Sequence, residues 1–105
     1  MRRIPLLSGE PHFRQRTSLD GSEYAFTFRW NGREGRWYFS IADANGDDVL
    51  VGLKLVANFP LLYRFRGVNG VPPGELTLVD ARSISLEPTL DDLGDFALTY
   101  EEAST

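Results

Sequence analysis

The sequence predicts an all-β domain, a small antiparallel barrel or sandwich of about six strands with one long apolar loop. Short runs of alternating apolar and polar residues are separated by turn sequences, and no long amphipathic helical stretch interrupts them. The chain has 105 residues, so we expect a single domain over residues 1–105 with a modest core. Periodicity locates strands without giving their order in space, which leaves both barrel and sandwich open.

The first three predicted strands form a meander that supplies most of the core. Residues 13–19 form the first strand, and Asp20-Gly21 after it is a strong signal for a tight hairpin turn. Residues 22–30 carry an aromatic side chain at every second position from Tyr24 on, which is the period of a half-buried strand. Residues 36–41 repeat the alternation, and the polar, glycine-containing joint between these two strands predicts a hairpin loop longer than two residues.

The fourth predicted strand covers residues 49–56, after a turn at Ala44-Asn45-Gly46. Its interior Gly52 indicates a bulge, a sharp bend or a close backbone approach. Simple alternation predicts that one face carries Val49, Val51, Leu53 and Leu55 and the other carries Leu50 and Val56. We therefore expect this strand to be covered in part on both sides.

Residues 57–74 form a long connection with three prolines and three glycines and no regular periodicity. Loops of this length are uncommon in compact domains, and the many apolar side chains argue against disorder. One interpretation is that the loop folds back over an open end of the sheet, with a helical turn at 61–63. The other is that it binds a partner, with Tyr63, Arg64 and Phe65 as anchors.

Together with the arginine-rich amino-terminal arm, the loop gives a hypothetical partner interface. Its predicted residues are Arg2, Arg3, Phe59, Leu61, Leu62, Tyr63, Arg64, Phe65 and Arg66.

Two further strands are predicted at 75–80 and 96–100, the second with Phe96, Leu98 and Tyr100 on one face. The segment between them allows one helical turn capped by Thr89.

Composition excludes several classes of function. The chain has no cysteine, so it can hold neither a disulfide nor a thiolate metal site. Its net charge of -4 and pI of about 4.9 argue against nucleic-acid binding through the phosphate backbone. No apolar segment approaches the roughly 20 residues of a membrane span, and the amino-terminal apolar stretch is too short for a signal peptide. Arginines concentrate in residues 1–36 and acids in 43–48 and 91–102, which fits an uneven solvated surface or head-to-tail protein contacts.

No motif predicts catalysis or a cofactor. The acidic residues at 43–48 lack the closing glutamate of a calcium loop, and we interpret them as a solvated hairpin tip. Asp91, Asp92 and Asp95 have no neighbouring signal for acid–base chemistry, so we interpret them as a polar loop. His12 is the single histidine, which excludes a multi-histidine metal site, and no glycine lies in a phosphate-loop setting. We expect neither an enzyme nor a bound cofactor or metal.

Several short segments resemble a known family. They are Met1-Arg2-Arg3-Ile4-Pro5-Leu6, Phe28-Arg29-Trp30-Asn31-Gly32, Gly35-Arg36-Trp37-Tyr38, Gly52-Leu53-Lys54-Leu55-Val56, Pro73-Gly74-Glu75-Leu76 and Asp91-Asp92-Leu93-Gly94-Asp95 before Leu98-Thr99-Tyr100. This pattern, spread over nearly the whole chain, resembles the small baseplate hub plug family of contractile-tailed bacteriophages, known from cyanophage. It consists of structural residues and not of a catalytic signature.

The resemblance implies a non-enzymatic component of a phage or prophage tail baseplate, located at the central hub and helping to close the tail lumen. It implies tail hub, tube or spike proteins as partners, a homo-oligomeric ring as one compatible arrangement, and residence in the virion after assembly in the host cytoplasm. We expect no direct nucleic-acid recognition and no membrane association. The alternative from the residues alone is a small ligand-binding or accessory barrel whose aromatics stack on a planar ligand. These aromatics are Tyr24, Trp30, Trp37 and Tyr38.

Overall fold

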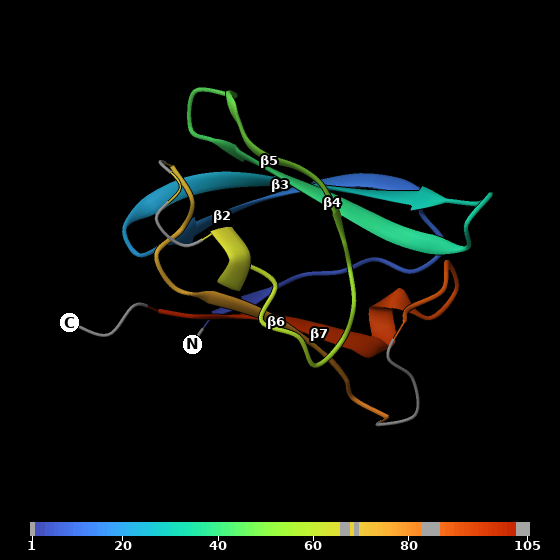
Figure 1. Ribbon diagram of the computed structural model, residues 1–105. Helices are drawn as coiled ribbons and strands as arrows, with labels where there is room; N and C mark the ends of the chain where they lie inside the picture. Colours follow the sequence, from blue (N-terminus) through green and yellow to red (C-terminus); the bar gives the residue numbers. More distant parts are fainter. Residues whose placement is uncertain (1, 66–67, 69, 83–86, 103–105) are drawn as a thin grey trace.

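The computed structural model describes residues 2–65, 68, 70–82 and 87–102. In this part of the chain, seven strands form two antiparallel sheets that pack face to face as a sandwich and do not close into a barrel (Figure 1). One sheet has the order β1-β7-β6 and the other the order β2-β3-β4-β5. The strands are β1 (Arg2–Ile4), β2 (His12–Leu19), β3 (Ser22–Asn31), β4 (Arg36–Asp43), β5 (Asp48–Lys54), β6 (Glu75–Asp80) and β7 (Phe96–Glu101). The prediction of an all-β antiparallel fold is confirmed, and of the two open architectures the sandwich is observed.

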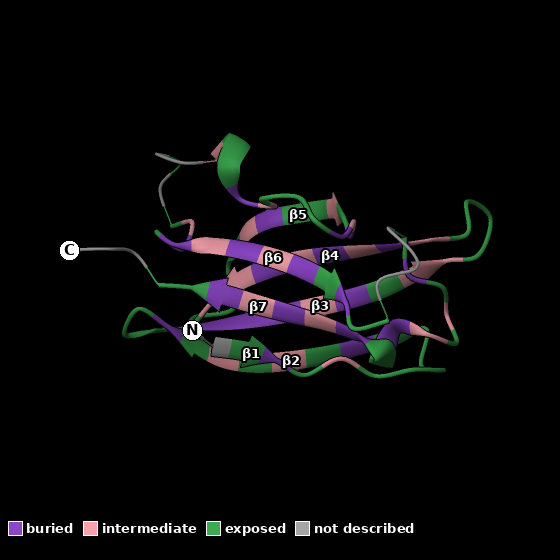
Figure 2. Ribbon diagram, turned by 90° about the horizontal axis from the view of Figure 1, so that it is seen from below, coloured by how far each residue is buried: buried purple, intermediate pink, exposed green. Residues whose placement is uncertain are grey.

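The strand at the amino terminus, β1, was not predicted. Its three residues are too few to show a periodicity, and they become a strand because they pair with β7, with Ile4 opposite Leu98. Ile4 is buried in the core, and β1 lies beside β2 at one side of the sandwich (Figure 2). The basic arm is therefore part of the fold.

The predicted meander of β2, β3 and β4 is confirmed. The pairing of Leu19 with Ser22 leaves a two-residue turn, Asp20-Gly21, in which both residues have positive φ (52° and 82°). That geometry belongs to the turn type whose twist matches antiparallel strands. The pairing of Asn31 with Arg36 leaves a longer loop between β3 and β4, as its composition predicts.

The β5 strand deviates from simple alternation. Phe39 pairs with Leu53 but Ile41 pairs with Leu50, so two residues of β5 face one residue of β4. Gly52 adopts the left-handed conformation in this bulge (φ 70°), and its N–H donates a 3.1 Å hydrogen bond to Ser40 Oγ. Because the bulge turns its neighbours, Val51 is 67% exposed, and the prediction that Val51 shares a covered face is wrong.

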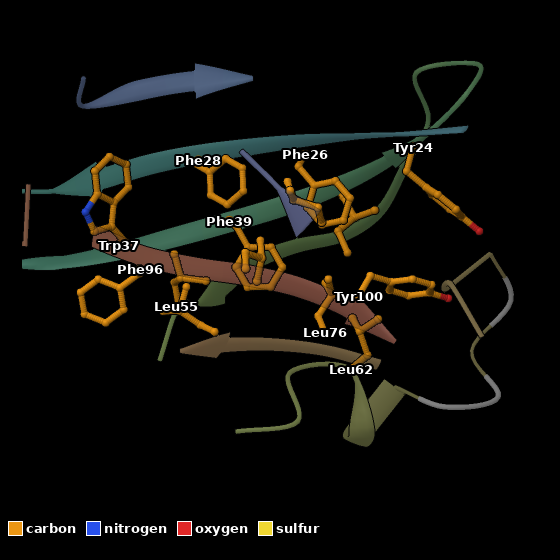
Figure 3. Close-up of a cluster of buried hydrophobic side chains, with 14 of the residues drawn as sticks. Tyr24, Phe26, Phe28, Trp37, Phe39, Leu55, Leu62, Leu76, Phe96 and Tyr100 are labelled. Atoms are coloured by element: carbon orange, nitrogen blue, oxygen red, sulfur yellow. The ribbon is translucent and has the colours of Figure 1, made fainter. Parts of the chain in front are cut away.

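The core lies between the two sheets and combines aromatic with aliphatic side chains (Figure 3). Phe28 stacks on Phe13, with ring centroids 4.9 Å apart, and the fully buried Trp37 meets Phe13 edge to face. The Trp37 indole N–H donates a 3.0 Å hydrogen bond to the carbonyl of Thr89, which satisfies its one polar atom. The alternating positions of β7 also face this core, as predicted: Phe96, Leu98 and Tyr100. Figure 2 shows buried residues along both sheets and exposed residues at the hairpin tips.

Two short 3-10 turns, η1 (Tyr63–Phe65) and η2 (Leu93–Asp95), lie outside the strands. The first begins two residues later than the predicted turn at 61–63. The second is not capped by Thr89, so that prediction is wrong. A capping Thr89 side chain would accept a backbone N–H of the turn. Instead, the Thr89 backbone N–H donates a 2.6 Å hydrogen bond to the Asp92 carboxylate.

Candidate partner-binding surface

The loop of residues 57–74 crosses from β5 in one sheet to β6 in the other. Its first part follows the edge of β6. Ala57 forms a parallel bridge with Leu78, the Asn58 N–H donates to the Leu78 carbonyl at 2.7 Å, and the Leu61 N–H donates to the Leu76 carbonyl at 3.0 Å. The loop thus satisfies backbone groups of β6 that would otherwise face solvent at the sheet edge.

One side of the loop closes the core. Leu62 is completely buried and points toward Leu76 and Tyr100 (Figure 3). Its N–H donates a 2.7 Å hydrogen bond to the carboxylate of Glu75, which also accepts from the Leu76 N–H at 3.0 Å. Leu62 was predicted as a partner contact, but its burial makes it a core residue of this chain.

The carboxyl end of the loop is fixed by Tyr100. The Gly74 N–H donates a 2.6 Å hydrogen bond to the Tyr100 phenol, and this phenol donates a 2.5 Å hydrogen bond to the carboxylate of Asp20. Burial and then the hydrogen bond to Asp20 raise the pKa of Tyr100. A side chain at Gly74 would collide with the Glu101 carbonyl and the Tyr100 ring, so the close approach requires glycine.

The other side of the loop is exposed. Phe59 and Tyr63 are 61% and 63% exposed, and Arg64 is exposed beside them in η1. The Arg64 guanidinium lies 5.5 Å from the centroid of the Phe65 ring, a cation–π distance. We call Phe59, Tyr63 and Arg64 the exposed loop face.

The remaining predicted loop residues contribute differently. Leu61 and Phe65 are half-buried and pack against the core, and Arg66 lies outside the described residues. One side of the loop therefore covers the core, as the first interpretation expects, and the other presents two aromatics and an arginine to solvent. Partner binding by this exposed side stays a prediction.

The amino-terminal arginines do not adjoin this surface. Their strand, β1, lies at the edge of the three-stranded sheet opposite β6, with β7 between them. Arg3 is exposed and pairs across the ladder with Thr99, whereas the position of the Arg2 side chain is not described. The predicted interface is thus divided into two separate regions.

The acidic residues near the end of the chain surround an arginine that the sequence did not single out. Arg82 lies 3.0 Å from both Asp80 and Asp92 and 3.6 Å from Asp95. Partial burial alone would raise the pKa of Asp92, but hydrogen bonds from the Thr89 N–H and Arg82 outweigh it and lower that pKa. A lowered pKa is the opposite of what a general acid needs, and these carboxylates serve the fold. The sequence pattern did not predict the contact between Arg82 and Asp92, because the two residues are ten positions apart.

The acidic hairpin tip is organised in a similar way. One carboxylate oxygen of Asp43 accepts the N–H groups of Asn45 and Asp47, at 2.9 and 3.0 Å. Within the described ranges, no group of three histidine, aspartate or glutamate side chains is placed to hold a metal ion. No helix in the same part of the chain is long and apolar enough to cross a membrane.

The aromatics of the ligand-binding alternative do not share an exposed face. Tyr24 and Trp37 are buried between the sheets, and the half-buried Trp30 packs edge to face on Trp37 with centroids 5.7 Å apart. Tyr38 points to the outer face of the sheet, where its hydroxyl donates to Glu34 at 2.9 Å. This arrangement offers no common stacking platform for a sugar or planar ligand.

Comparison with known proteins agrees with the resemblance found in the sequence. A search of curated proteins gave no match. Residues 1–103 match the family described as "Cyanophage baseplate Pam3 plug gp18". The match covers both sheets, the loop and the Arg82 cluster. This chain belongs to the cyanophage baseplate plug family.

Proposed function

We propose that this protein is a non-enzymatic structural component at the central hub of a contractile tail baseplate. There it helps to close the tail lumen through contacts with hub, tube or spike proteins, and the exposed loop face is the main contact. Family membership supports the baseplate setting. The observation that supports this contact is the exposure of Phe59 and Tyr63 on a loop that is otherwise hydrogen-bonded to β6 and β7.

The loop has two properties that favour binding. Aromatic and arginine side chains dominate binding energy at protein interfaces, and the exposed loop face supplies both kinds. Its backbone is also held in place, by Glu75 near Leu62 and by Tyr100 at Gly74. Because the loop backbone at Leu62 and at Gly74 is already held by hydrogen bonds, association loses less conformational entropy than it would with a free segment.

The test introduces two substitutions together, Phe59→Ser and Tyr63→Ser, into this protein within a phage or prophage gene cluster that produces tail particles. We expect the purified variant to keep the thermal midpoint of the natural protein within a few degrees, because both side chains are mostly exposed. We expect it to be missing from purified tail particles when these are analysed by mass spectrometry.

The matched control is Val51→Ser, which removes an equally exposed apolar side chain from the β5 bulge. This variant should enter particles normally. If the double loop variant enters particles normally, the exposed loop face is not the main contact with tail proteins. A pull-down of the tagged protein from cells that express the gene cluster provides the second test. Recovery of the tagged protein alone, without hub, tube or spike proteins, would contradict the proposed role in the baseplate.

A further inference from the structure

The outer face of the four-stranded sheet carries two exposed arginines, Arg14 and Arg29. Arg14 on β2 pairs across the ladder with Thr27, and Arg29 on β3 pairs with His12, so the two arginines are diagonal neighbours on one face. Both are exposed, and no carboxylate of the described residues forms an ion pair with either. We call Arg14 and Arg29 the basic face.

This arrangement contrasts with the other cations of the same sheet. Arg16 forms a 3.1 Å ion pair with Glu23, and Arg36 and Lys54 both pair with Glu87. The chain has 15 acidic residues and 11 lysines and arginines, so carboxylates are abundant. Like charges on neighbouring strands repel each other. The basic face is therefore a place where an external carboxylate would lower the electrostatic energy.

Two exposed acidic residues lie at the opposite end of the sheet. Asp47 and Asp48 are exposed in the β4–β5 hairpin, and neither forms an ion pair with a cation of the described residues. The hairpin extends away from the body of the sandwich (Figure 1), and the backbone bonds to Asp43 fix its shape. We call Asp47 and Asp48 the acidic tip.

The two charged surfaces cannot neutralise each other within one chain. The hairpin begins at Asp43, which pairs with Tyr24 on β3. Along β3, Thr27 opposite Arg14 lies three residues further and Arg29 five residues further, which are spans of about 10 and 17 Å. Charges in water are largely screened beyond about 8 Å at physiological salt. The acidic tip of one molecule can reach a basic face only on another molecule.

We propose that copies of this protein associate head to tail, with the acidic tip of one copy on the basic face of the next. Arginine and carboxylate groups form directional, charge-assisted hydrogen bonds that suit such a contact. Because the two surfaces differ, the contact is heterologous and builds a ring if the rotation closes or a filament if it does not. The net charge of -4 favours a second copy of the protein over a nucleic acid as the partner of the basic face. The contact uses neither the exposed loop face nor the baseplate, so it can be tested on the purified protein.

The test is sedimentation velocity of the full chain in low salt at up to about 1 mM, where even a millimolar Kd gives a detectable complex. We expect concentration-dependent association that disappears at about 1 M salt, where the screening length is about 3 Å. The double variants R14E/R29E and D47R/D48R should each remain monomeric. An equimolar mixture of the two should associate again, because every tip then meets a face of opposite charge.

A net-charge control is R3E/R33E, which changes the charge as much as R14E/R29E and alters exposed arginines outside the basic face, the acidic tip and the exposed loop face. It should associate like the natural protein. The proposal is overturned if the natural protein stays monomeric at about 1 mM, or if the mixed variants fail to associate. Association that survives high salt, or a gel shift of a DNA oligonucleotide that depends on Arg14 and Arg29, would also overturn it. None of these results depends on incorporation into tails, so this proposal and the proposed function can fail separately.

Discussion

The Tyr100 phenol of β7 donates a 2.5 Å hydrogen bond to the Asp20 carboxylate in the β2–β3 turn, and so connects the two sheets. The same oxygen accepts the N–H of Gly74 at 2.6 Å. One hydroxyl therefore joins a hairpin turn, the last strand and the end of the long loop. The junction therefore fixes the carboxyl end of the loop that carries the exposed loop face.

We expect Tyr100→Phe to lower the free energy of unfolding by about 1–3 kcal/mol, because the buried Gly74 N–H loses its acceptor. Urea unfolding followed by tryptophan fluorescence measures the change. Tyr38→Phe is the matched control, since it removes an exposed hydroxyl bound to Glu34, and it should change stability by less than about 0.5 kcal/mol. Equal effects of the two variants would contradict the role of the junction.

The raised pKa of Tyr100 gives stability a dependence on high pH. Below about pH 10, tyrosine is protonated in both folded and unfolded chains. Above it, the unfolded chain loses the proton first while folded Tyr100 keeps it, so stability falls as the pH rises. The natural protein should lose more stability than Tyr100→Phe between about pH 8 and 11. Urea midpoints that fall in parallel for both proteins would disprove this explanation.

We expect Gly74→Ala to destabilise the fold by about 1–3 kcal/mol or more, because its Cβ would lie 2.6 Å from the Tyr100 ring. At Gly32 the nearest atom to such a Cβ is Trp30 Nε1 at 3.5 Å, an ordinary contact. Gly32→Ala should therefore be nearly neutral. Thermal unfolding of both variants tests the difference, and a tolerated Gly74→Ala would show that the loop end can move.

The two sides of the loop should respond differently to truncation. Leu62→Ala removes a completely buried side chain and should cost about 2–5 kcal/mol of unfolding free energy. Phe59→Ala removes a larger side chain that is 61% exposed, and it should stay within about 0.5 kcal/mol of the natural protein. Urea unfolding measures both. A large loss for Phe59→Ala would mean that the exposed loop face supports the fold.

Arg82 should matter more than an arginine of the basic face. Its guanidinium bonds the buried Asp80, so Arg82→Ala should cost about 1–3 kcal/mol, whereas Arg14→Ala should be nearly neutral. The cost of Arg82→Lys should lie between the costs of Arg82→Ala and Arg14→Ala, because lysine keeps the charge but cannot form the same bidentate contacts. The lowered pKa of Asp92 means that its contribution is present above about pH 4 and is lost as the pH falls further. The cost of Arg82→Ala should therefore shrink in acid, and a constant cost down to about pH 2 would contradict this account.

Except for β1, the described strands and most of their turns could be predicted from the sequence, because they follow from local chemistry. Period-two alternation identified β3, β4 and β7, and the left-handed preference of Asp20-Gly21 set the first hairpin. The sequence also indicated the irregularity at Gly52, and for the long loop it left two alternatives open, covering the core or binding a partner. The resemblance to the plug family likewise rested on these local turn and core residues.

The arrangement of the strands and the loop in space follows from contacts between segments that are far apart in the sequence. The division into two sheets, the short strand β1 and the junction of Tyr100 with Asp20 depend on residues up to 80 positions apart. The burial of Leu62, the exposure of Val51 and the carboxylates around Arg82 arise in the same way. Local periodicity reports which face of a strand is apolar, but it contains no information on which distant segment covers that face. The loop side chains that remain exposed, and that form the proposed partner-binding surface, are therefore known only from the packing of the core.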